Sequence, residues 1–296
     1  MRVAITGAAG FVGRAVAARL ATQHPEVALL LVDRAFDRAG VAPTLTGDLT
    51  DAGFLRAICD RSDVVIHLAA LPGGAAEQDA AASRAINLDV PLALIDGMAG
   101  RRLVIAGSIA VFGHALAEPV DDMTPVRPAS VYGTHKAMVE LAFADAVRRA
   151  AVAGMVLRLP GIVARPAAGN GFGSAFLSDV FHAARQGRRY TLPAAADATS
   201  WLMSARTCAA NLVAAALGPD SAQAAVTLPA LRVRIGDLIA ELARHGDVGG
   251  IDHAEDAATR RMFGSYPPLA TPRADALGFA HDGTLAQLVE TALADI

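Results

Sequence analysis

The sequence is poor in several residue types, and each shortage excludes a class of protein. Its two cysteines, Cys59 and Cys208, lie far apart and form no CxxC pattern, so we expect ordinary buried thiols, with neither a disulfide nor a metal site. No apolar run reaches the ~18 residues of a transmembrane helix. The opening MRVAITGAAG has glycines where a signal peptide needs an apolar run. We therefore expect a cytoplasmic protein with no membrane partner.

Positive charge is also limited. The 26 basic residues are outnumbered by 29 acidic ones, and the net charge of −3 argues against the basic surface that nucleic acid requires. Every basic residue except Lys136 is an arginine. A single lysine in such a chain can mark a position that needs a compact ammonium, with chance as the alternative.

Strand-like and helix-like segments alternate along the first 160 residues. The predicted strands cover residues 2–6, 27–32, 64–69, 103–106 and 155–159. The predicted helices cover residues 11–22, 51–59, 78–98 and 132–151, with a kink at Pro91. This alternation predicts an α/β fold, a Rossmann-type doubly wound parallel sheet with right-handed crossovers. Later helices are expected at 174–186, 204–217, 235–244 and 284–293, and surface loops at 246–250 and 266–272.

The first predicted strand runs into a glycine-rich turn, Gly7-Ala8-Ala9-Gly10-Phe11-Val12-Gly13. Glycines allow a tight turn, close approach of backbone N–H groups to a pyrophosphate, and close packing of helix on strand. The start of the helix adds a partial positive charge. Gly7, Gly10, Phe11, Val12 and Gly13 are thus predicted to bind a dinucleotide.

Asp33 closes the second strand about 20 residues beyond the last glycine, where a carboxylate can bind both hydroxyls of a ribose. Its charge would repel a 2′-phosphate, so NAD is favoured. Arg34 and Arg38 lie nearby and leave NADP open.

Two further segments are predicted to line the cofactor. Asp48 and Leu49 follow a further strand expected between those at 27–32 and 64–69, where a carboxylate can accept a bond from the adenine, while Thr50 or Asp51 caps the next helix. Small residues at the end of the strand at 64–69 let the cofactor lie flat on the backbone. These residues are Leu68, Ala69 and Ala70, and the preceding His67 is interpreted as a packing residue.

The catalytic prediction depends on Tyr132-Gly133-Thr134-His135-Lys136. Positions i and i+4 share a helix face, so Tyr132 and Lys136 project together. An ammonium nearby stabilises a phenolate and brings a tyrosine, whose ordinary pKa is about 10, closer to the working pH of a general base. Ser108, at the end of a strand, can hold the reacting oxygen. The bland alternative for the pair is an amphipathic helix surface.

The glycine turn, the Asp48 segment, Ser108 and YxxxK occur in the order seen in the extended short-chain dehydrogenase/reductases, a group that includes nucleotide-sugar epimerases and dehydratases. The chain resembles that family over residues 1 to ~165. The resemblance implies an NAD-binding Rossmann domain at 1–163 and a smaller, mainly substrate-binding region at 164–296, with a soft boundary because late segments can return to the sheet. It also implies cofactor contacts by Asn87, Tyr132, Lys136, Pro160 and Ile162.

Within the family, YGTHKAMVELAFADAVRR, LRLPGIVARP, WLMSAR and VTLPALRVRIGDLIAELAR are most similar to the D-erythronate 2-dehydrogenase branch. That similarity implies NAD-dependent oxidation of the C2 hydroxyl of a small sugar acid to a 2-oxo acid. Tyr132 would be the general base, Lys136 would lower its pKa and hold the ribose, and Ser108 would position the reacting oxygen. Substrate contacts are expected from Ser108, Tyr132, Arg165, Asn170, Ser174 and Arg206.

This chain departs from that branch around the substrate. Ala168 and Ala175 stand where the relatives carry a lysine and a serine, Ser200 replaces an arginine before Trp201, and His114 follows the catalytic serine in a changed loop. A different sugar acid or polyol is therefore left open, and Arg206 has a surface ion pair as its alternative role.

Two other functions remain open from sequence. An epimerase or dehydratase that retains its NAD would use the same core residues. An NAD-binding protein without turnover would need the glycine turn but not Ser108, Tyr132 and Lys136 together. The resemblance further implies a homodimer through a four-helix bundle, formed by the helices at 78–98 and 132–151.

Overall fold

The computed structural model describes residues 1–37, 41–166, 173–221 and 224–296. The chain divides into two compact units that do not follow a single cut in the sequence. Unit 1 comprises Met1–Val111, Val126–Leu159 and Ala209–Thr227, and unit 2 comprises Phe112–Pro125, Pro160–Cys208 and Leu228–Ile296.

Unit 1 is built on a seven-stranded sheet in the order β10-β6-β5-β4-β1-β2-β3, in which every neighbouring pair is parallel. Its strands are β1 (Arg2–Thr6), β2 (Ala28–Asp33), β3 (Thr44–Thr46), β4 (Val64–His67), β5 (Arg102–Ser108), β6 (Ala153–Leu159) and β10 (Ala225–Thr227). The strand order reverses between β1 and β4, which creates the crevice where doubly wound sheets bind ligands. The predicted Rossmann-type fold is confirmed.

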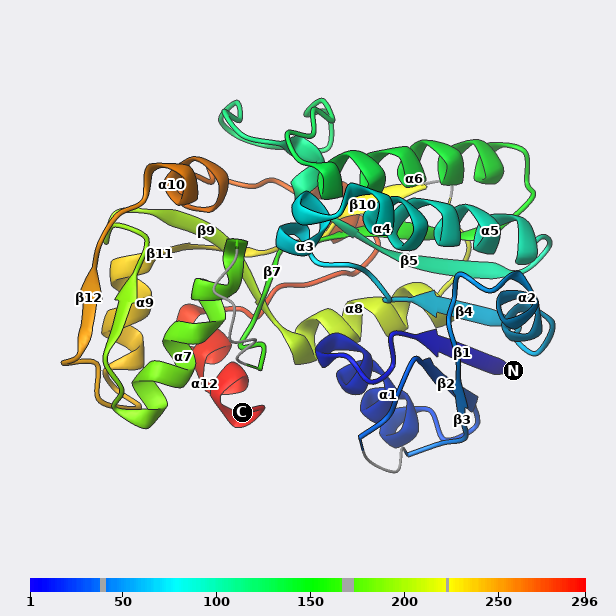
Figure 1. Cartoon of the computed structure of the whole chain (residues 1–296), viewed down its shortest axis with the longest axis horizontal. Coiled ribbons are helices and arrows are strands. Elements are labelled where there is room, and N and C mark those ends of the chain that lie inside the picture. Colours follow the sequence, from blue (N-terminus) through cyan, green and yellow to red (C-terminus); the bar gives the residue numbers. More distant parts are fainter. Residues whose placement is uncertain (38–40, 167–172, 222–223) are drawn as a thin grey trace. The chain divides into compact units, whose positions relative to one another are not determined.

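The helices of unit 1 cover both faces of the sheet, and Figure 1 shows α1 and α8 on one face and α4, α5 and α6 on the other. They are α1 (Phe11–Gln23), α2 (Ala52–Asp60), α3 (Gly73–Gln78), α4 (Ala80–Arg84), a π-helical segment η1 (Ala85–Asp89), α5 (Val90–Gly97), α6 (Val131–Arg148) and most of α8 (Ala205–Leu217). The 3₁₀ turn η2 (Ile109–Phe112) follows β5. Parallel strands buried under helices explain the continuous apolar runs in the sequence.

The segment predicted as one helix at 78–98 is divided in the structure. A π-turn, η1, interrupts it, and α5 starts afresh with Pro91 in its first turn. Proline is tolerated there because first-turn N–H groups have no partner within the helix. Pro91 was expected to kink or restart the helix, and the structure shows a restart.

Unit 2 contains a three-stranded sheet, β11-β9-β7, and a two-stranded sheet, β12-β8. The strands are β7 (Gly161–Val163), β8 (Tyr190–Leu192), β9 (Thr199–Ser204), β11 (Leu231–Arg234) and β12 (Ile251–His253). The helical elements are η3 (Gly173–Ala175), α7 (Phe176–Gln186), α9 (Ile235–Leu242), α10 (Ala257–Phe263), α11 (Pro272–Ala276) and α12 (Leu285–Ala294). Leu177, Leu202, Leu238 and Leu288 belong to its hydrophobic core.

Two further observations bear on the sequence predictions. Cys59 and Cys208 are both free and buried, as expected. Over the residues that the structure describes, none of the helices combines the length and apolar character needed to cross a membrane.

Candidate active site

The turn after β1 forms a cradle that glycine alone fits. Gly7 has a φ of +75°, and a Cβ at this position would lie 2.6 Å from the backbone nitrogen of Ala69. A Cβ on Gly13 would lie 2.1 Å from the carbonyl oxygen of Gly7. Gly10 is the N-cap of α1 and brings no side-chain cap, which leaves the first-turn N–H groups to a ligand. The cradle fits the pyrophosphate of a dinucleotide.

The side chain of Asp33, at the end of β2, is hydrogen-bonded to this turn. One carboxylate oxygen accepts a hydrogen bond from the backbone N–H of Ala9 (2.9 Å), and the other accepts one from Arg34 N–H (2.8 Å). The carboxylate thus lies beside the glycine turn with acceptor capacity left for hydroxyl groups, since each carboxylate oxygen has two lone pairs. Its negative charge disfavours a 2′-phosphate at the same place.

The Asp48 segment separates two roles that the sequence left open. Asp51 is the N-cap of α2 and accepts a bond from Phe54 N–H (2.7 Å). Asp48 instead forms a turn in which its carboxylate accepts bonds from the N–H and the hydroxyl of Thr50. These bonds hold the pKa of its carboxyl below the usual value. Asp48 is exposed and ionised, as a contact to an adenine amino group requires.

His67, at the end of β4, is fully buried, and one ring nitrogen, Nδ1, bonds the Thr6 hydroxyl across the sheet (2.7 Å). Burial lowers the pKa of its imidazole to about 3, and the ammonium of Lys136 adds to this effect. The ring is therefore neutral at physiological pH. This agrees with a packing role and leaves the following residues, Leu68, Ala69 and Ala70, as the wall of the crevice.

Lys136 is the most unusual side chain of unit 1, because an ammonium on α6 is only 2% exposed. Its Nζ donates to the carbonyl oxygen of Ala106 on β5 (2.7 Å) and lies 5.5 Å from the centroid of the Tyr132 ring. Burial lowers its pKa to about 8, against an opposing effect from Glu140. The predicted pair is thus on one helix face, and the lysine is mostly protonated at pH 7.

Glu140, one turn beyond Lys136, is also buried, and it forms a two-pronged ion pair with Arg158 of β6. The distances are 3.0 Å from Arg158 Nε to Oε1 and 2.8 Å from NH2 to Oε2. The carboxylate is thus paired with the arginine, and its negative charge also raises the pKa of Lys136.

Gly133, the second residue of YGTHK, brings α6 against the segment after β5. A Cβ at this position would lie 2.4 Å from the carbonyl oxygen of Ala110. The neighbouring Ser108 accepts a bond from Ala110 N–H (3.1 Å) and still has its own hydrogen to donate. The structure therefore brings Ser108, Tyr132 and Lys136 into one region of unit 1. The sequence analysis did not single out Gly133, although its place inside the motif was a signal.

The start of α6 is fixed from two sides. Ser130 is the N-cap and accepts a bond from Gly133 N–H (3.0 Å), and Glu77 of α3 accepts one from Val131 N–H (2.6 Å). The two bonds satisfy N–H groups that a helix leaves without partners in its first turn. They therefore stabilise the turn of α6 that carries Tyr132.

Of the predicted substrate residues, Ser108 and Tyr132 fall in unit 1, whereas Arg165, Ser174 and Arg206 fall in unit 2. An NH2 group of Arg165 contacts Ser174 through its carbonyl (3.3 Å) and its hydroxyl (3.2 Å), so these two lie together. Arg206 is exposed and pairs with Asp295 (2.9 Å), the alternative that the sequence left open. Asn170 lies outside the described residues. Pro160 and Ile162 are buried, the latter in β7.

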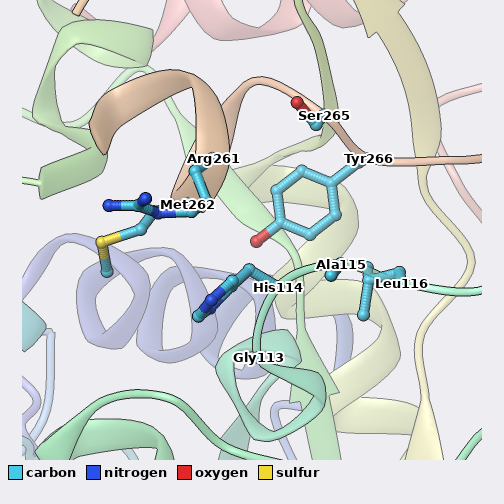
Figure 2. Close-up of a pocket in the computed structure, with 8 residues that line it drawn as sticks. All are labelled: Gly113, His114, Ala115, Leu116, Arg261, Met262, Ser265 and Tyr266. Atoms are coloured by element: carbon cyan, nitrogen blue, oxygen red, sulfur yellow. The ribbon is translucent and has the colours of Figure 1, made fainter. Parts of the chain in front are cut away.

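Unit 2 also contains a polar pocket that the sequence analysis did not assign. Figure 2 shows the hydroxyl of Tyr266 pointing toward the side of the pocket lined by His114 and Arg261. Ser265 also lines the pocket, but its hydroxyl donates to the carbonyl oxygen of Arg260 (3.0 Å). The rest of the lining comes from Gly113, Ala115, Leu116 and Met262. His114 follows Ser108 by only six residues and was the one feature visible in the sequence.

Tyr266 is buried, although it belongs to the segment 266–272 that was predicted as a surface loop. Its side chain is 8% exposed, and its ring lies 4.6 Å from that of Trp201, centroid to centroid. Its carbonyl oxygen accepts bonds from Thr199 and Arg232 (2.8 Å each). Burial raises the pKa of its phenol to about 12, so the hydroxyl remains a hydrogen-bond donor.

The chain is similar to known proteins over nearly its whole length. Residues 3–224 match the model of the NAD dependent epimerase/dehydratase family. The chain is 32% identical to a D-erythronate dehydrogenase of Cupriavidus necator over 100% of its own length and 98% of the relative's. It is 28% identical to the Haemophilus influenzae D-erythronate dehydrogenase over 98% of each. The solved structure of a nucleoside-diphosphate-sugar epimerase from Agrobacterium tumefaciens superposes with a TM-score of 0.89 at 29% identity, covering 100% and 94%.

The buried ammonium predicts a particular pH dependence of stability. Because the folded-state pKa of Lys136 is about 8 and the ordinary value is 10.5, the unfolded chain binds more protons between these values. The free energy of unfolding should therefore rise as the pH increases from 8 to 10.5. In urea unfolding of NAD-free protein, the free energy of unfolding of the wild type should rise over this pH range by on the order of 2 kcal/mol more than that of Lys136→Met. Parallel pH curves for the two proteins would contradict the assignment.

Proposed function

Since the chain belongs to the NAD dependent epimerase/dehydratase family, we propose that it oxidises the C2 hydroxyl of a small sugar acid, similar to D-erythronate, to the 2-oxo acid. The chain is an NAD-dependent oxidoreductase. The observation that carries the sugar-acid proposal is the likeness to two D-erythronate dehydrogenases over practically the whole chain, including unit 2. The resemblance seen in the sequence is confirmed at the level of the family.

Bound NAD would supply the hydride acceptor, with the glycine turn and Asp33 of unit 1 holding it. The phenolate oxygen of Tyr132 takes the proton of the C2 hydroxyl, the C2 hydrogen leaves with its electron pair, and the C2–O bond becomes a carbonyl. The ammonium of Lys136 stabilises the phenolate, because opposite charge favours the ionised form. Ser108 donates its hydrogen to the reacting oxygen.

The likeness to the D-erythronate dehydrogenases supports the predicted substrate contacts of unit 2. Arg165 and Ser174 contact each other, so they would act together on the substrate. An arginine is the donor type that binds carboxylates best, and we assign the carboxylate of the substrate to Arg165.

A second candidate is an epimerase that retains its cofactor, which the similarity to the nucleoside-diphosphate-sugar epimerase structure favours. The two functions differ in net chemistry, because an epimerase returns the hydride and leaves no reduced cofactor at the end of a turnover.

The first experiment separates these functions and tests the base. NADH absorbance at 340 nm should rise when the protein is mixed with NAD and C4–C6 sugar acids, including D-erythronate. Tyr132→Phe should bind NAD normally and lose at least ~100-fold in kcat, since a general base contributes about that much or more. Conversion of a nucleotide sugar without NADH accumulation would favour the epimerase, and full activity of the variant would exclude Tyr132 as the base.

The second experiment tests the carboxylate contact. Arg165→Leu should raise the KM for the sugar acid by roughly 10- to 100-fold, because a charge-assisted hydrogen bond contributes about 1.5–3 kcal/mol, and should leave the KM for NAD unchanged. Arg206→Leu is the matched control, since it removes another predicted substrate arginine, one that pairs with Asp295. A larger KM effect of Arg206→Leu would move the carboxylate site to that residue.

We also propose a homodimer that pairs α5 and α6 with their copies in a four-helix bundle. Two large apolar side chains on α6 support it, Met138 (46% exposed) and Leu141 (74%). Leu141→Glu should shift the mass measured by light scattering from two chains to one, because a charge cannot be buried in an apolar interface without a partner. Val41→Glu, at another exposed apolar position, is the control and should remain dimeric. A wild-type mass of one chain would refute the dimer.

A further inference from the structure

A chain of hydrogen bonds connects the catalytic helix α6 to the wall of the cofactor crevice. Nδ1 of His135 lies 2.9 Å from the hydroxyl of Ser83, and that hydroxyl accepts from the Asn87 amide (3.0 Å). Asn87 then holds the backbone of Leu71 on both sides, accepting from its N–H (2.9 Å) and donating to its carbonyl (3.0 Å). All four residues belong to unit 1, in which α4 and the π-turn η1 pack against α6.

The direction of each bond in this chain follows from its partners. Leu71 N–H can only donate, so it fixes which end of the Asn87 amide is oxygen. Both hydrogens of the Asn87 nitrogen are then used, one on Leu71 O and one on Ser83 Oγ. We assign the hydrogen of the Ser83 hydroxyl to Nδ1 of His135, because the described residues offer it no other acceptor. In this assignment Nδ1 is the acceptor.

The segment that this chain holds lies on the glycine turn. Leu71 closes the stretch that begins at Leu68, and the backbone of Ala69 in that stretch is the atom group nearest to an added Cβ on Gly7. Ser83 and Asn87 are completely buried, so a bond lost between them and His135 is not replaced by water. The π-turn at 85–89 carries Asn87, and such turns often occur at functional sites.

We propose that His135 is a positioning residue that ties the helix carrying Tyr132 and Lys136 to the Leu68–Leu71 segment, and so sets the width of the NAD crevice. The link runs from α6 through Ser83 and Asn87 to the segment that meets the glycine turn. The motif YxxxK leaves the residue at position 135 unspecified.

The test compares two substitutions at one position. His135→Leu removes the acceptor, whereas His135→Asn keeps an oxygen close to the place of Nδ1. His135→Leu should raise the dissociation constant of NAD, measured by titration calorimetry, by about tenfold, in line with a buried hydroxyl left without its acceptor. His135→Asn should restore it to within about threefold of the wild type, which a merely space-filling role of the ring would not allow. Equal weakening in both variants, or none in either, would overturn the proposal.

A readout without cofactor keeps this test separate from the proposed function. In NAD-free protein, amide hydrogen exchange of a peptide containing residues 68–71 should be faster in His135→Leu and normal in His135→Asn. The control is Thr134→Ala, which removes a bond to Ser130 O from the same helix turn but stands outside the chain of contacts. Exchange unchanged in His135→Leu, or accelerated as much in Thr134→Ala, would overturn the proposal whatever the substrate proves to be.

A double substitution tests whether the link is continuous. Ser83→Ala should weaken NAD binding about as much as His135→Leu, and the two together should weaken it no further, because each already breaks the same chain. Losses that multiply in the double variant would show that the two residues act independently and would refute the link.

Discussion

A protonated amine buried under the sheet is the constraint on which the site depends. Lys136 has lost nearly all contact with water, and its pKa falls to about 8 as a result. The chain tolerates this cost because the ammonium donates to Ala106 O and because the nearby Glu140 carboxylate raises its pKa against the effect of burial. An ammonium so poorly hydrated interacts strongly with any negative charge that forms beside it. The nearby phenol of Tyr132 is where such a charge would form.

The second constraint is the close approach of main-chain segments at three glycines. Gly7 lies against Ala69, Gly13 against Gly7, and Gly133 against Ala110, in each case closer than a Cβ would permit. These contacts bring a strand, a turn and two helices to the crevice where the strand order of the sheet reverses. The cofactor site is therefore formed by main-chain surfaces, and its side chains add charge and hydrogen bonds at few points.

The sequence predicted unit 1 well because strong local signals agreed with one another. Apolar runs identified the strands, Pro91 marked a real break, and the spacing of Tyr132 and Lys136 placed both on one helix face. The strands of unit 2 were harder to predict, since β7, β8 and β12 have only three residues each, too few to show a period, whereas the helix predicted at 204–217 agrees with α8. The polar pocket joins residues near positions 114 and 265, and no local pattern connects segments so far apart. Ion pairs are equally invisible in sequence, as Arg206 and Asp295 show.

The seven-stranded sheet is completed late in the chain. Its edge strand β10 pairs with β6, yet 65 residues, most of them belonging to unit 2, separate Leu159 from Ala225. While the ribosome makes that stretch, the outer edge of β6 has no partner and offers unpaired N–H and C=O groups to other chains. The nascent protein thus passes through a state prone to edge-to-edge association, and a chaperone that covers β6 would act in this interval.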